Sequence, residues 1–86
     1  MKYDQQMKNR LRRIEGQVRG LIRMMEEEKE CKEVVAQISA VRNALDKAAA
    51  LIVGTNLEQC VREQIEQGLD TEETIQEAVN LLVKSR

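Results

Sequence analysis

The sequence of 86 residues contains no histidine, tryptophan, phenylalanine or proline, and it has a single tyrosine. Without histidine, the chain has neither the nucleophile–histidine pair of many hydrolases nor a Cys/His zinc site. It also lacks paired-carboxylate and glycine-rich phosphate-loop signatures, so the sequence indicates no enzyme. Without large aromatic anchors, so short a chain buries little core of its own. These absences favour a protein that completes its core by oligomerisation.

The remaining composition predicts an all-α protein with one domain over residues 1–86. Proline is absent, glycine occurs four times, and charged residues make up 34% of a chain rich in helix-forming residues. No apolar run approaches the ~18 residues of a membrane span. The N-terminus carries charges but no apolar signal segment. We therefore expect a cytoplasmic protein without a membrane partner, whose thiols are normally reduced.

Charge is divided unevenly along the chain. Residues 1–25 carry seven basic and two acidic side chains, although the net charge of the whole chain is −1. Basic residues occupy both flanks of a helical apolar stripe: Lys8, Arg12, Arg19 and Arg23 lie on one flank, and Arg10 and Arg13 lie on the other together with the neutral Gln17. A solvated helix face would carry mixed signs, so the pattern favours binding of phosphate groups, although the pI of 5.5 is low for a nucleic-acid-binding domain.

Periodicity and capping residues predict three helices. Their expected bounds are 4–28, Cys31 to about Gln67, and about Thr71 to Val83. Asp4 and Asp70 are expected N-caps and Gly68 a helix-ending glycine. The acidic run at residues 26–30 is the expected break after the first helix. Gly54-Thr55-Asn56 is the weak point of the second helix, and the sequence leaves open whether the helix bends there.

The two cysteines, Cys31 and Cys60, lie near opposite ends of the second predicted helix. Their 29-residue separation corresponds to roughly 43 Å on a straight helix, whereas a disulfide requires Cα atoms within about 7 Å. The two thiols can therefore meet only across two chains, if this helix pairs antiparallel with its copy. Cys31 begins a helix, where the dipole favours the nucleophilic thiolate. The structural alternative is that each cysteine is a small buried apolar residue.

Three segments carry a family resemblance: NRLRRIEGQVRGLIRMMEEEKECKEVVAQISAVRNAL, then NLEQC, then EAVNLL. They resemble the copper-sensing operon repressor (CsoR/RcnR) family of bacterial transcriptional repressors over nearly the whole chain. The resemblance implies three helices per protomer, an antiparallel four-helix-bundle dimer, and a dimer-of-dimers homotetramer that binds operator DNA. By matching positions, it implies DNA contacts at Arg10 and Lys47. Arg13 and Gln17 are expected beside them, and the basic Lys8 and Arg19 complete the predicted DNA-binding set.

The resemblance also assigns the sensor. Copper-sensing members use a cysteine, then a histidine and a second cysteine from the other subunit; this chain has Cys31 and Cys60 but Asn56 in place of the histidine. Two cysteines without histidine resemble the CsoR-like sulfurtransferase repressor (CstR) branch, which senses reactive sulfur species. The implied chemistry is attack by Cys31 on persulfide or polysulfide and resolution by Cys60 of the other subunit, giving a di-, tri- or tetrasulfide link that releases DNA. No resident metal or cofactor is then expected.

Two other functions remain open from the sequence. A soft thiolate pair can hold Cu(I), so a Cu(I)-responsive repressor that uses Cys31 and Cys60 is the first alternative. The second is a helical oligomer that binds no DNA and whose cysteines have no sensory role. Loss of DNA binding on treatment with polysulfide, with Cu(I), or with neither distinguishes the three.

Overall fold

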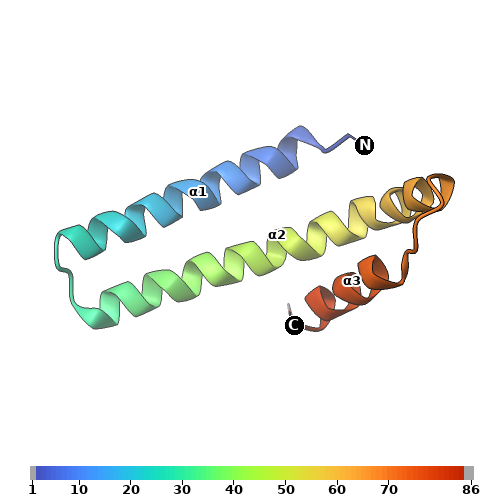
Figure 1. The fold of residues 1–86 in the computed structure, drawn as a ribbon. Helices are drawn as coiled ribbons and strands as arrows, with labels where there is room; N and C mark the ends of the chain where they lie inside the picture. Colours follow the sequence, from blue (N-terminus) through green and yellow to red (C-terminus); the bar gives the residue numbers. More distant parts are fainter. Residues whose placement is uncertain (1, 85–86) are drawn as a thin grey trace.

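The computed structural model describes residues 2–84, and within that range it contains three helices and no strand. They are α1 (Gln5–Glu26), α2 (Cys31–Glu66) and α3 (Glu72–Lys84). Figure 1 shows α1 and α2 side by side and antiparallel, with α3 folded back against the C-terminal part of α2. The all-α prediction is confirmed, and each helix boundary lies within about two residues of its expected position, as is usual for sequence-based bounds.

The helix starts follow the predicted caps. Asp4 accepts a hydrogen bond of 2.8 Å from the backbone N–H of Gln6, and Asp70 accepts one of 3.0 Å from that of Glu72. Each carboxylate thus satisfies a backbone donor that has no partner inside its helix. The two caps start α1 and α3 where the sequence predicts.

The helix ends share one hydrogen-bond pattern with different residues at the turn. After α2, Gly68 adopts the left-handed φ of 74°, and Leu69 N–H donates to the carbonyl of Gln64 at 2.8 Å. After α1, Glu28 adopts a φ of 55°, and Lys29 N–H donates to the carbonyl of Met24 at 3.0 Å. The predicted break at residues 26–30 is confirmed. Its turn needs no glycine because Glu28 takes the left-handed conformation, at a cost of about 1 kcal/mol.

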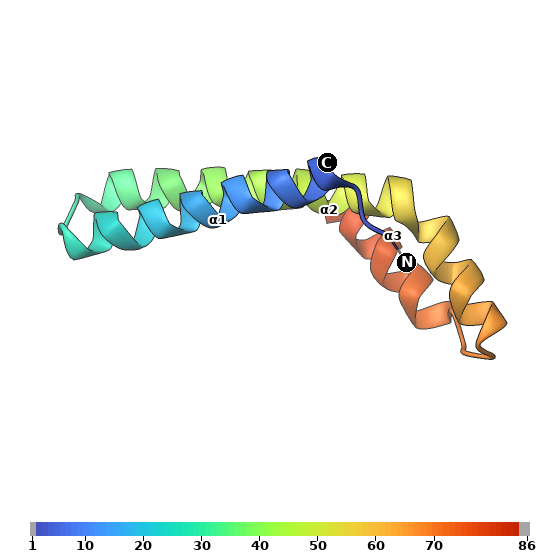
Figure 2. The same ribbon diagram turned by 90° about the horizontal axis from the view of Figure 1, so that it is seen from above.

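Helix α2 bends but is not interrupted at its weak point. Figure 2 shows the bend in its second half, where α3 begins to cover it. Gly54 has no neighbouring atom within 4 Å of a Cβ position, and the Thr55 hydroxyl donates to the Leu51 carbonyl at 2.9 Å. A threonine that bonds back to the preceding turn commonly bends a helix. Both residues lie in the Gly54-Thr55-Asn56 segment, so the sequence identifies the site of the bend.

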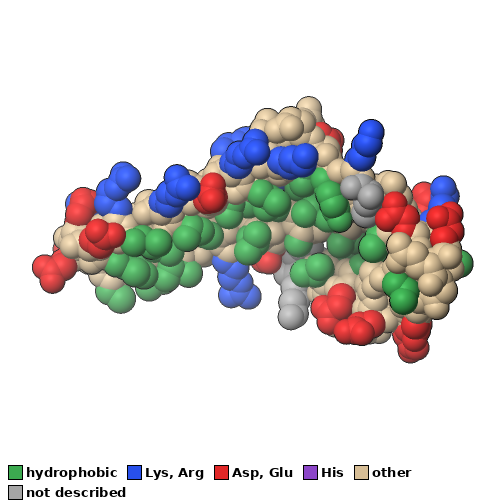
Figure 3. Space-filling view, turned by 45° about the horizontal axis from the view of Figure 1, so that its top comes forward, with side chains coloured by type: hydrophobic (Ala, Val, Ile, Leu, Met, Phe, Trp, Pro, Cys, Tyr) green, Lys and Arg blue, Asp and Glu red, His purple; other side chains and the backbone are tan. Residues whose placement is uncertain are grey.

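Little of the apolar surface is buried within one protomer. In the described range only Ile14, Ala48 and Ala78 form a buried core. Larger side chains remain open along the hairpin, including Ile38 at 43% and Leu45 at 51% exposure. Figure 3 shows apolar side chains exposed along the length of the hairpin, with most of the basic side chains above them. A protomer with so little buried core leaves most of its apolar side chains for another surface to cover. No helix within residues 2–84 is both long and apolar enough to cross a membrane.

Candidate functional site

Cys31 is the first residue of α2, beside the turn that joins α1 to α2. Its thiol is exposed. Lys29 and Lys32 alternate with Glu30 and Glu33 around it, and the exposed Glu26, Glu27 and Glu28 make the turn acidic as a whole. Glu30 is the N-cap residue of α2, and its side chain forms no capping hydrogen bond. In a single protomer, Cys31 is therefore open to solvent.

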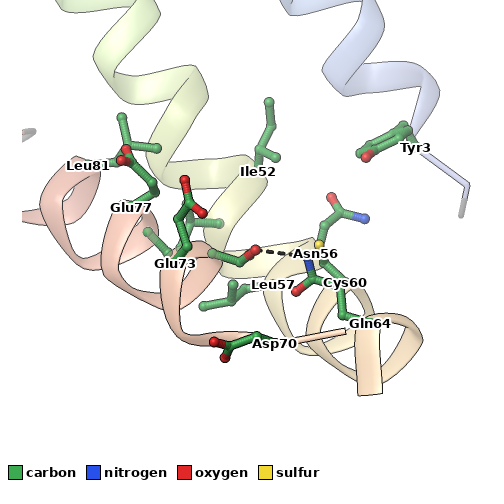
Figure 4. A pocket seen from close by; sticks show the side chains of 13 residues that line it. Tyr3, Ile52, Asn56, Leu57, Cys60, Gln64, Asp70, Glu73, Glu77 and Leu81 are labelled. Atoms are coloured by element: carbon green, nitrogen blue, oxygen red, sulfur yellow. Dashed lines mark hydrogen bonds between the residues drawn. The ribbon is translucent and has the colours of Figure 1, made fainter. Parts of the chain in front are cut away.

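Cys60 lies in a different environment, in the last two turns of α2. It is half-buried and lines a cavity of about 450 Å³ between the C-terminal part of α2 and α3, with Tyr3 on the side of α1. Figure 4 shows the sulfur atom of Cys60 beside Asn56 and Gln64, with α3 opposite. The apolar residues Leu57 and Ala78 also line it. This thiol is therefore half-exposed within an open, partly apolar cavity.

A polar contact joins the two sides of this cavity. The side-chain amide of Gln64 donates a hydrogen bond of 2.9 Å to the hydroxyl of Thr74, which links α2 to α3. The Oε1 atom of Gln64 is buried and has no hydrogen-bond partner among residues 2–84. The sequence does not reveal this contact because the two residues belong to different helices.

Asn56 lies one helical turn before Cys60 and lines the same cavity. Its Oδ1 atom lies 2.9 Å from the hydroxyl of Thr55, whose single proton is shared between this atom and the Leu51 carbonyl. The position that the resemblance assigns to a metal-binding histidine thus holds a neutral amide. Amide oxygen is a poor ligand for a soft ion such as Cu(I). Within residues 2–84 of one protomer, no three Cys, His, Asp or Glu side chains come together to hold a metal ion.

One protomer does not bring its two cysteines together. Both belong to the same uninterrupted helix, Cys31 at its first residue and Cys60 near its last turns. A straight helix would separate their Cα atoms by roughly 43 Å, and a single bend leaves them far beyond the reach of a disulfide. The expectation that they cannot meet within one chain is confirmed. Pairing with the partner's thiols stays a prediction.

Four of the predicted DNA-contact residues lie together. Arg10, Arg13 and Gln17 of α1 and Lys47 of α2 line one groove between these helices. Asn43 lines the same groove and was not predicted. Because it precedes Lys47 by four residues, helical periodicity alone was enough to place it on the same face. The groove offers two guanidinium groups, one ammonium group and two amides, a set suited to phosphate oxygens.

Lys8 and Arg19 lie away from this groove. Neither residue lines it, and at 100° per residue both fall on the opposite flank of α1 from Arg10. Arg19 lies 3.8 Å from the carboxylate of Glu15 on the same exposed surface. The structure therefore divides the six predicted DNA-binding residues into a groove set of four and an outer pair.

A family model, a curated relative and a solved structure that resemble this chain are all described as transcriptional repressors or regulators. Residues 3–84 match the family model described as a metal-sensitive transcriptional repressor. The chain is 62% identical over 63 residues to the uncharacterised protein YrkD of Bacillus subtilis, which spans 73% of this chain and all of that protein. It is 48% identical over 69 residues to the copper-sensing transcriptional repressor RicR of Mycobacterium tuberculosis, 77% of this chain and 72% of the relative. Among solved structures, the nickel-responsive transcriptional regulator InrS superimposes with a TM-score of 0.64 at 35% identity, over 99% of this chain and 94% of that one.

Proposed function

This chain belongs to the family of metal-sensitive transcriptional repressors, and on that basis we propose that it represses transcription under the control of persulfide or polysulfide. In its reduced form it binds operator DNA. It releases DNA when Cys31 of one subunit and Cys60 of another become linked through sulfur. The observation that carries the choice of inducer is the cavity of Cys60, where Asn56 supplies an amide and no nitrogen ligand.

The open face of α2 supports pairing with a second copy. Cys31, Ile38, Leu45 and Ile52 recur every seven residues, and at 100° per residue Cys60 falls within about 60° of the same direction. Ile38 and Leu45 on this face are half exposed in the protomer. An antiparallel pair of α2 helices that sets Cys31 against the partner's Cys60 has its two-fold axis midway between them, beside Leu45. The same pairing covers the apolar residues and joins the thiols.

The groove between α1 and α2 supports DNA binding. Arg10, Arg13, Gln17 and Lys47 present donors to phosphate oxygens from two helices. Phosphate contacts of this kind supply affinity and orientation, and their strength falls steeply with salt. Lys8 and Arg19 extend the positive surface around α1. We assign the groove residues to the DNA backbone and the outer pair to longer-range attraction.

The proposed chemistry uses sulfane sulfur as the oxidant. The Cys31 thiolate attacks the terminal sulfur of a polysulfide, which forms a sulfur–sulfur bond at Cys31 and expels the shortened polysulfide. The partner's Cys60 thiolate then attacks the Cys31 persulfide and expels hydrosulfide. Two thiols are oxidised, and one sulfane sulfur leaves as sulfide. Attack on a longer chain leaves one or two sulfur atoms in the link.

The test combines DNA binding with intact mass. Reduced protein is bound to the DNA upstream of its own gene and treated with polysulfide. We expect loss of binding together with a covalent dimer, and reversal of both by a thiol reductant. Cys31→Ala should remain bound under the same treatment. Release of that variant would show that Cys31 is not the nucleophile.

Cu(I) is the second candidate inducer. Two thiols suit Cu(I), and relatives such as RicR are named as copper-sensing repressors. The same DNA-binding assay with Cu(I) in place of polysulfide decides between them. Release by Cu(I) in a thiol-containing buffer, without any covalent dimer and without a response to polysulfide, would replace the sulfur proposal with this one.

A further inference from the structure

The N-terminal segment, residues 2–4, forms part of the wall of the Cys60 cavity. Of the described residues that line this cavity, only Tyr3 precedes α2 in the chain. Figure 4 shows its ring pointing from the N-terminal segment toward Ile52 and Asn56. Tyr3 is 51% exposed and belongs to a non-helical part of the chain. It is therefore the part of the wall that yields most readily when the cavity is filled.

The next residue of the same segment reaches the basic surface. Asp4 lines a hollow of about 400 Å³ together with Arg10 and Arg13. Both arginines also line the groove that contains Lys47, so this hollow continues the groove toward the start of α1. One peptide unit, with Cα atoms about 3.8 Å apart, thus joins Tyr3 in the thiol cavity to Asp4 beside the groove.

Asp4 ties this connection to the first turn of α1. Its carboxylate accepts the 2.8 Å hydrogen bond from the N–H of Gln6, and its carbonyl accepts one of 3.2 Å from the N–H of Lys8. A residue held by both groups moves with the helix that it caps. Arg10 lies six residues further, about 9 Å along the helix axis. A displacement of Tyr3 therefore either moves the start of α1 or breaks its cap, and both change the position of Arg10 in the groove.

Resting on the proposed function, we infer that Tyr3 is a positioning residue that transmits the state of Cys60 to the basic groove. In the reduced protein the ring occupies the cavity, the cap of α1 is intact, and the arginines are placed for DNA. A sulfur link to the partner's Cys31 brings new atoms into the cavity beside Asn56, and the ring leaves because a filled site does not hold both. The start of α1 then shifts, and phosphate contacts of the groove are lost.

Substitution of Tyr3 separates this coupling from the cross-link itself. The Kd for the DNA upstream of the gene is measured for reduced and for polysulfide-treated protein, and the ratio of the two values reports the coupling. Allosteric coupling usually changes an affinity about 5- to 150-fold, and we expect the parent protein to lie in this range. Tyr3→Ala should give the same yield of covalent dimer with a ratio close to one. Its reduced form should bind DNA as weakly as the cross-linked parent, because it lacks the ring that holds the start of α1.

Tyr3→Phe is the matched control, because it keeps the ring and removes only the hydroxyl group. It should retain the ratio of the parent protein. A merely structural role of Tyr3 would lower the stability of both states and leave the ratio unchanged, so a Tyr3→Ala protein with the parent's ratio would overturn the inference. Loss of the ratio in Tyr3→Phe would also overturn it, since phenylalanine fills the same part of the cavity.

Alkylation of Cys60 tests the coupling without any sulfur donor. In a Cys31→Ser protein, iodoacetamide has one thiol to modify; the Cys60 thiolate forms a carbon–sulfur bond and iodide leaves. The neutral adduct fills part of the cavity, so it should weaken DNA binding in this protein and have little effect once Tyr3→Ala is added. An equal loss with and without the ring would refute the coupling.

The fluorescence of Tyr3 follows the ring directly. The chain has one tyrosine and no tryptophan, so its emission comes from this residue alone. After alkylation of Cys60, quenching by acrylamide should rise toward the value of the unfolded chain, because the ring leaves the cavity. Unchanged quenching would show that the ring stays in place and would contradict the inference.

The coupling and the proposed function fail in different ways. If alkylation of Cys60 weakens DNA binding through Tyr3 and polysulfide forms no covalent dimer, the coupling stands and the sulfur proposal fails. If polysulfide cross-links the protein and releases DNA equally from the parent and from Tyr3→Ala, the sulfur proposal stands and the coupling fails.

Discussion

Replacement of Leu45 by alanine should weaken dimerisation about 30-fold. Leu45 is 51% exposed in the protomer and lies beside the proposed two-fold axis of an antiparallel α2 pair. Complete burial of a leucine side chain contributes about 2 kcal/mol, so covering the exposed half contributes about 1 kcal/mol. Symmetry brings both copies to the same contact, which makes about 2 kcal/mol per dimer. Because about 1.4 kcal/mol corresponds to a tenfold change in Kd, the loss of about 2 kcal/mol raises the Kd of the dimer about 30-fold.

The assay is sedimentation equilibrium of the reduced protein over a range of concentrations. Ile65→Ala is the matched control, because Ile65 is 64% exposed on the same helix and, at 100° per residue, points roughly opposite to Leu45. Helix content by circular dichroism should be similar in both variants at high concentration. Equal dissociation constants for Leu45→Ala and the parent protein, or a larger effect from Ile65→Ala, would refute the antiparallel pairing through this face.

Three further substitutions test other parts of the structure. Glu28→Gly removes the cost of a left-handed glutamate and should raise the stability by about 1 kcal/mol, seen as a higher Tm at matched protein concentration; a lower Tm would contradict the φ of 55°. Lys47→Ala should weaken DNA binding and reduce the slope of log K against log salt by about one, whereas Arg62→Ala, at a residue already paired with Glu58, should leave the slope unchanged. Gly54→Ala should raise the urea midpoint, because alanine is about 1 kcal/mol better in a helix and the site has open space for a Cβ atom; a decrease would mean that another subunit needs that space.

Local features of the fold were predictable from the sequence. Asp4, Gly68 and Asp70 act on backbone groups within a few residues, so their roles as caps and turn could be stated without knowledge of the tertiary structure. The sequence predicted the position of the turn at Glu28 but not the left-handed backbone conformation of this residue. A left-handed glutamate is unfavourable locally, and we infer that helix–helix packing on both sides maintains it.

The candidate site was predictable in its residues more than in its surroundings. Helical periodicity put Arg10, Arg13 and Gln17 on one flank, but the groove also needs Lys47 from the next helix. The carboxylates around Cys60 come from α3, and their position follows from how α3 packs on α2. Such contacts depend on long-range packing, which no local pattern encodes.

The arrangement of the three helices has a mechanical consequence. Within the described chain, α1 and α3 each pack on α2 and do not contact one another. Helix α2 is therefore the one helix shared by both features. Its N-terminal half lines the groove through Lys47, and its C-terminal part lines the cavity of Cys60. In elements connected in series, the most compliant segment determines how much of a movement is transmitted. In α2 that segment is Gly54-Thr55-Asn56. We expect the stiffness of this segment to determine how far a displacement around Cys60 moves the residues of the groove.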